Sequence, residues 1–147
     1  MCENCWEGIC INKRDLKLDR YNISRYTYRE LHNYCLQYPE KKKQLAWARA
    51  PYNSPTIDLM PKGGDVGRPT EKAAERAAIL AQDVEQIERI AKEAGGDDAD
   101  NLLIAVTQGV PTHYLKTLRD MKTGINQFNN KRRMFFYLLA KEKNKIF

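Results

Sequence analysis

The side chains with the most specific chemistry in this chain are amides and cations near its C-terminal end. At 100° per residue, one face of a helix over residues 125–137 carries Asn126, Gln127, Asn130, Lys131, Arg133, Met134 and Tyr137. The opposite face carries Ile125, Phe128, Phe135, Phe136 and Leu139, with Arg132 among them. Amides bond adenine through two hydrogen bonds, guanidinium groups bond guanine in the same way, and ammonium groups hold phosphate. The polar face is therefore typical of a helix that reads base edges in duplex DNA.

A second helical pattern comes just before this one, as a reading helix requires. Its apolar positions are Tyr114, Leu115, Leu118 and Met121, and the segment Met121–Gly124 separates it from the next helix. A helix, a short turn and a second helix is the arrangement that docks in the major groove. We expect a helix-turn-helix module over residues 97–147, with the helix 125–140 in the groove. The cations expected on the flanking phosphates are Lys116, Arg119 and Lys122.

The positive charge of the chain is concentrated in the same segment. The 147 residues carry 25 basic and 19 acidic side chains, a net charge of +6. Residues 111–147 hold nine basic and two acidic side chains, so residues 1–110 are almost neutral. A basic segment on a neutral body is the electrostatic signature of a polyanion-binding surface. Cations also favour helix C-termini, which accounts for Lys141 to Lys145 but not for the cations in mid-helix.

Three cysteines at the start of the chain have the spacing of metal ligands. Cys2, Cys5 and Cys10 form C-x2-C-x4-C, which matches the first three ligand positions of a zinc knuckle. The fourth position is Asp15, so a tetrahedral site would need Cys35 or His32 to be brought back by the fold. The alternative, which we favour, is an N-terminal arm with free thiols. Apart from this zinc hypothesis, no cofactor is expected.

The elements that must position these residues are all predicted to be helical. A helix is expected over residues 26–38 from a 3-4-3 spacing of apolar side chains, and a second begins at Pro39 and contains Trp47 as a packing residue. Residues 50–70 form a linker rich in proline and glycine. Thr70 is expected to cap a long helix that ends at Ala94. No alternating strand pattern of useful length appears.

The long helix carries a heptad pattern of apolar residues. Its seam consists of Ala73, Ala77, Leu80, Val84, Ile87, Ala91 and Ala94. The seam over residues 73–94 packs within the chain or forms a homodimer, and intramolecular packing is the commoner outcome. We therefore expect an all-α fold in which N-terminal helices and a long heptad-patterned helix precede the C-terminal helix-turn-helix.

This pattern divides the chain into three regions. They are a cysteine-rich arm over residues 1–25, a helical body over 26–94 that includes the linker 50–70, and the module 97–147. No apolar stretch approaches the roughly 18 residues of a membrane span, and no signal-peptide pattern opens the chain. We expect a cytoplasmic protein with reduced cysteines and no membrane partner. His32 and His113 stand in no catalytic or metal-binding spacing, so we do not expect an enzyme.

Three stretches of the chain resemble small phage and prophage proteins of low-GC Gram-positive bacteria. They are residues 28–31 with 35–40, residues 59–63, and residues 109–141, of which the last matches best. These proteins look similar to late-operon transcriptional regulators of the ArpU/RinA type, whose C-terminal part is like the helix-turn-helix of sigma-factor region 4. The resemblance covers roughly residues 26–143, and it implies DNA binding and transcription control inside a bacterial host cell.

The chain departs from this group in two places. The group's turn is Pro-Cys-Gly, and here it is Lys122-Thr123-Gly124, which puts the base sequence that is read in doubt. The cysteine-rich first ten residues have no counterpart in the group.

Two other functions fit the same residues. The basic face of the module fits an acidic host protein, such as RNA polymerase or a defence enzyme, because modules of this kind bind protein as well as DNA. Binding of RNA or of a single strand would need several tyrosines exposed along one groove. Duplex DNA is the partner that the polar face of helix 125–140 favours.

Overall fold

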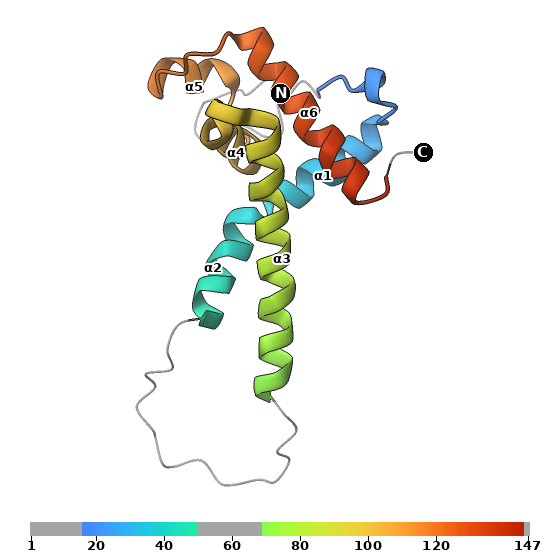
Figure 1. Cartoon of the computed structure of the whole chain (residues 1–147), viewed down its shortest axis with the longest axis vertical. Coiled ribbons are helices and arrows are strands. Elements are labelled where there is room, and N and C mark those ends of the chain that lie inside the picture. The colour runs from blue at the N-terminus through green and yellow to red at the C-terminus, as the bar shows by residue number, and fades with distance from the viewer. Residues whose placement is uncertain (1–15, 50–68, 146–147) are drawn as a thin grey trace, which may run out of the picture.

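A computed structural model describes residues 16–49 and 69–145. Within this part of the chain there are six α-helices, two short 3-10 turns and no β-strand, which confirms the all-α prediction (Figure 1). The helices are α1 (Arg25–Leu36), α2 (Tyr38–Arg49), α3 (Pro69–Gly95), α4 (Ala99–Gln108), α5 (Thr112–Leu118) and α6 (Ile125–Glu142). The 3-10 turns are η1 (Asp19–Tyr21) and η2 (Gly96–Asp98). None of the described helices is long and apolar enough to cross a membrane.

The first two helices follow one another almost without a break. Ser24 caps α1, because its hydroxyl accepts a hydrogen bond from the backbone N–H of Thr27 at 3.2 Å. Only Gln37 separates α1 from α2. Pro39 is the second residue of α2, where its missing N–H leaves no helical hydrogen bond unmade. A new helix therefore begins next to this proline, at Tyr38, one residue before the start that the sequence predicts.

Helix α3 is the longest element, and its two halves differ. Its 27 residues span about 40 Å at 1.5 Å per residue, and it begins at Pro69, one residue before the expected cap. Val84, Ile87 and Ala91 are buried, whereas Ala73 is exposed. Figure 1 shows the first half projecting from the rest of the molecule with α2 beside it. The second half of the predicted seam is therefore used inside the chain, and only its first half is left for a homodimer.

Short connections join α3 to the three C-terminal helices. Gly96, at φ +56°, and Gly109, at φ +66°, adopt the left-handed conformation that ends α3 and α4. Pro111 directly precedes α5, and Gly124 directly precedes α6. A glycine or a proline therefore stands at each of these breaks.

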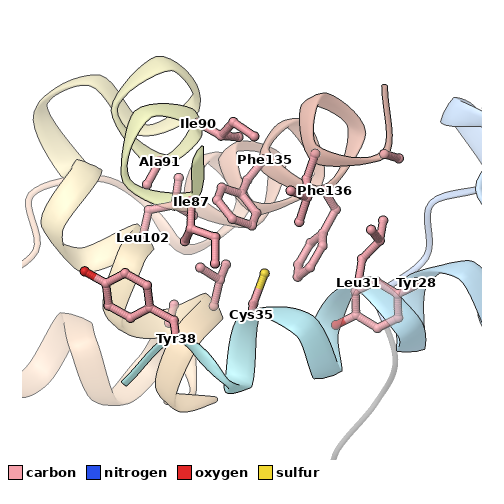
Figure 2. Close-up of a cluster of buried hydrophobic side chains, with 14 of the residues drawn as sticks. Tyr28, Leu31, Cys35, Tyr38, Ile87, Ile90, Ala91, Leu102, Phe135 and Phe136 are labelled. Carbon is pink, nitrogen blue, oxygen red and sulfur yellow. The ribbon is translucent and has the colours of Figure 1, made fainter. Parts of the chain in front are cut away.

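One hydrophobic core unites the N-terminal and C-terminal helices. Figure 2 shows Phe135 and Phe136 of α6 facing side chains from α1 and α3, with their own rings nearly perpendicular at 5.3 Å. Phe136 also meets the ring of Tyr28 edge-on at 4.9 Å. Leu18 and Ile23, which the sequence assigns to the arm, belong to this core. The predicted boundary between residues 94 and 97 therefore does not separate two cores.

The apolar stripe of α6 is shorter than predicted. Phe128, Phe135 and Leu139 are fully buried, but Ile125 is 41% exposed. Phe128 closes the end of the core, and Ile125 lies one helical turn beyond it. On the other face, Tyr137 is half-buried because its ring packs against Tyr21 at 4.9 Å.

Candidate nucleic-acid interface

The segment from α5 to α6 is held in place at the start of α5 and in the connection between the two helices. Six residues connect the two helices, and Met121 in this connection is buried at 4% exposure. The hydroxyl of Thr112, at the start of α5, lies 3.1 Å from the side-chain oxygen of Asn129 on α6 and donates to it. The connection and the first helix are therefore fixed against α6, as a reading element requires.

Asp98 links the same segment to the end of α3. Its carboxylate accepts hydrogen bonds from the ammonium group of Lys131 at 2.8 Å and from the hydroxyl of Thr123. Lys131 also donates to the backbone carbonyl of Gly95 at 3.0 Å. The hydrogen bond from Lys131, followed by that from Thr123, lowers the pKa of Asp98 below its ordinary value. This Asp98 cluster joins the turn, the body of α6 and the junction between α3 and α4.

Lys131 is therefore not available as the DNA contact that the sequence predicts. Helical spacing places its backbone on the polar face of α6, but its long side chain reaches back to the end of α3. There the ammonium group satisfies a terminal carbonyl and a nearly buried carboxylate. The role of Lys131 in this structure is to hold α6 in position.

Arg133 is engaged in part. Its Nε donates to the backbone carbonyl of Lys17 at 3.2 Å, and its Nη1 donates to the side-chain oxygen of Asn130 at 2.8 Å. The guanidinium group is thus oriented by the segment that precedes α1. Asn130 is exposed and keeps its amide N–H groups for another partner.

The remaining predicted contacts are exposed and make no ion pair or side-chain hydrogen bond with another described residue. They are Asn126 and Gln127 on the first turn of α6, Lys116 on α5, and Arg119 and Lys122 in the connection. Two amides and three cations therefore face solvent on one short segment.

Several other cations of the C-terminal segment serve the fold. Arg132 is partly buried, burial lowers its pKa, and its Nε has no hydrogen-bond partner among the described residues. Lys143 lies 3.7 Å from the centre of the Tyr34 ring, and Lys145 pairs with Glu30 at 3.0 Å. The charge surplus of residues 111–147 thus overstates the charge that is free to meet a polyanion.

The same segment exposes large apolar side chains as well. Tyr114 and Leu118 on α5 are 53% and 64% exposed. Ile125, the first residue of α6, is 41% exposed, so the segment from α5 to α6 has an apolar component that its charge pattern does not reveal. Exposed apolar side chains of this size suit contact with protein, or with thymine methyl groups.

The cysteines of the zinc hypothesis fall in two different situations. Cys2, Cys5 and Cys10 lie outside the described residues. Cys35 is fully buried among the core side chains, and burial raises the pKa of its thiol to about 12 (Figure 2). A buried thiol of this kind is not available as the fourth ligand. In residues 16–49 and 69–145 no group of three His, Cys, Asp or Glu side chains is placed to hold a metal ion.

Sequence reasoning missed the Asp98 cluster, which matters most for the position of α6. Nothing in the sequence spacing connects Asp98 to a lysine 33 residues later. No family model, curated protein or solved structure matches this chain. The interface is therefore interpreted from its own geometry.

Proposed function

We propose that the protein is a transcriptional regulator that binds duplex DNA with a helix-turn-helix formed by α5, the connection 119–124 and α6. One observation carries this proposal. The first turns of α6 present Asn126, Gln127 and Asn130 to solvent, while Phe128 is buried on the opposite face and the side chain of Lys131 ties the helix to the end of α3. Amides on a rigid helix end are the groups that form paired hydrogen bonds with adenine in the major groove.

The cations around this helix end supply the contacts to phosphate. Lys116, Arg119 and Lys122 are the free cations that flank the first turn of α6. Neutralising about three phosphates makes log K fall with log salt at a slope near −3. Such a protein acts in the cytoplasm of a bacterial host cell, and catalysis has no part in the proposal. The resemblance to late-operon regulators supports the same function.

The experiment that tests this function compares two duplexes. The binding of the full chain to the DNA upstream of its own gene and to a scrambled duplex is measured at two salt concentrations. We expect tight, salt-sensitive binding with a clear preference for the upstream duplex. Equal and weak binding to both duplexes would reject the regulator function.

A second candidate function has its own observation in the same segment. Tyr114, Leu118 and Ile125 are exposed beside the free cations, which is the composition of a surface that binds an acidic host protein, for instance RNA polymerase or a defence protein. Leu118→Glu should abolish such protein binding and leave the preference between duplexes intact. If the variant instead loses DNA binding alone, Leu118 belongs to the DNA interface.

A further inference from the structure

A groove between α2 and α4 lies outside the proposed DNA interface. Both helices pack beside α3 (Figure 1). The hollow between them measures about 500 Å³. Its walls consist of Tyr38, Pro39, Lys42, Lys43 and Ala46 from α2, and Leu103, Ile104, Thr107 and Gln108 from α4. Leu103 and Ile104 on the α4 wall are only partly buried.

Helix α2 also carries an exposed aromatic side chain next in sequence to the groove residue Ala46. Trp47 follows Lys43 by one helical turn and is 76% exposed, although the sequence predicts it to pack. Exposing a tryptophan beside a groove with an apolar floor costs free energy, and it is typical of a protein-binding surface. A groove between two helices with an apolar wall is a surface on which an amphipathic helix lays its apolar face.

The charge of the groove is of one sign. Its lining contains two lysines and no acid. The ammonium nitrogen of Lys42 forms an ion pair with a carboxylate oxygen of Glu88 on α3 at 3.3 Å. Lys43 is exposed and has no ion-pair partner among the described residues. The acid of α2, Glu40, is not part of this lining, and the exposed Asp100 precedes the α4 wall by one turn. An occupant therefore meets apolar side chains on α4 and positive charge on α2.

We infer that this groove binds an amphipathic helix of a partner protein, with its apolar stripe on Leu103 and Ile104 and acidic side chains toward Lys43. Trp47 covers the end of the bound helix. The groove uses none of the residues proposed to contact DNA, so a partner and a duplex bind at the same time. In this inference a regulator bound at its site recruits an acidic helical segment of another protein. The recruiting role rests on the proposed function, but the binding itself does not.

The test uses a labelled synthetic peptide of about four helical turns whose leucine stripe is flanked by glutamates. A matched peptide has lysines in place of the glutamates, and binding to the full chain is followed by fluorescence anisotropy. We expect the acidic peptide to bind and the basic one not to bind. Trp47→Ala should weaken binding about tenfold or more, and Lys43→Glu about three- to tenfold.

Two charge reversals separate this inference from the proposed function. Lys43→Glu should weaken peptide binding and leave binding to the upstream duplex unchanged, whereas Lys116→Glu should do the reverse. Both positions are exposed, and circular dichroism verifies that both variants fold. Equal binding of both peptides, or binding of neither, would overturn the inference whether or not DNA is bound. If the chain dimerises and Trp47→Ala dissociates the dimer, the occupant is a second copy and the inference is likewise overturned.

Discussion

In the C-terminal half of α6, Phe135, Phe136 and Leu139 have no exposed surface, whereas the first turn exposes Ile125 and Asn126. The two halves belong to one continuous helix of 18 residues. Burial of large apolar side chains at one end holds the helix in the core, so that the other end can keep unpaired polar groups in solvent. Apart from Phe128, which is buried near the start of α6, the side chains that stabilise the fold by burial lie in the C-terminal half of this helix, and the exposed amides lie in the other half.

Lys131 lies near the middle of α6, and it stabilises the fold as the buried C-terminal half does. Its side chain is bonded to Asp98 and Gly95, so a residue on the polar face contributes to the position of the helix. The comparison predicts that changes at the buried end lower stability, and that changes at the exposed end alter binding alone.

The largest effect is expected from Phe135→Ala. This side chain is fully buried and packs edge-on against Phe136, so its removal leaves a cavity and should cost about 3–5 kcal/mol of unfolding free energy. Urea denaturation measures the loss. Ile125→Ala, in the exposed first turn, is the matched control and should change stability by about 0.5 kcal/mol or less. Similar losses in both variants would remove the distinction between the two halves.

The next effect is expected from Asp98→Ala. It leaves the ammonium group of Lys131 and the hydroxyl of Thr123 without their acceptor, which should cost about 1–3 kcal/mol. The pKa of Asp98 is lowered, so the stability from its ionised form is fully present above the unfolded-state pKa of about 3.9 and is lost as the pH falls through the folded-state pKa.

This pH dependence can be isolated with Asp98→Asn. Other acids, such as Glu142 in its pair with Arg89, titrate in both proteins and cancel in the comparison. The wild-type protein should lose more stability between pH 5 and pH 2 than the variant does. Parallel loss in the two proteins would show that Asp98 is not the titrating group.

A smaller and more selective effect is expected from Asn130→Ala. It should cost about 1–3 kcal/mol of binding on the preferred duplex and nothing on a scrambled one. Asn126→Ala should have the same effect on binding. It should not disturb Arg133, because the guanidinium group of Arg133 is bonded to Asn130 and not to Asn126. Equal weakening on every duplex would show that these amides do not read bases.

The smallest effect is expected from Lys122→Ala. Removing one free cation should reduce the salt slope of DNA binding by about 1 and leave the denaturation curve unchanged. Lys131→Ala is the contrasting variant: it should lower stability, because it removes the bonds to Asp98 and Gly95. A change of salt slope for Lys131→Ala without a loss of stability would assign that lysine to the DNA after all.

The helices of this fold could be predicted because their signals are local. The spacing of Tyr28, Leu31 and Cys35, and the positions of Gly109 and Pro39, depend on neighbours within one or two turns. Contacts between distant residues leave no such pattern. Lys131 and Asp98 are 33 residues apart, and whether a lysine is free or paired depends on where the fold brings its acid.

The position of the candidate site could therefore be predicted from the sequence, but the residues that are free to bind DNA there could not all be predicted. Asn126, Gln127 and the three cations nearby are exposed as the helical wheel predicts. A helical wheel of α6 cannot distinguish them from Lys131, because it does not show that the end of α3 packs close enough to bond this lysine. The exposure of Trp47 could not be predicted for a related reason. Tryptophan side chains are usually buried in contacts, but the residue type does not say whether those contacts lie within the chain or with a partner.

The core shared between α6 and the N-terminal helices limits how the DNA-binding specificity of this protein can change in evolution. A DNA-binding element that folds by itself can be exchanged between proteins by recombination as an intact piece. Here Phe136 packs on Tyr28, and Lys131 closes the end of α3, so a crossover between α3 and α4 separates the reading helix from the residues that fix it. New specificities in such a chain are expected to arise by substitution at the exposed first turn of α6, not by exchange of the whole C-terminal segment.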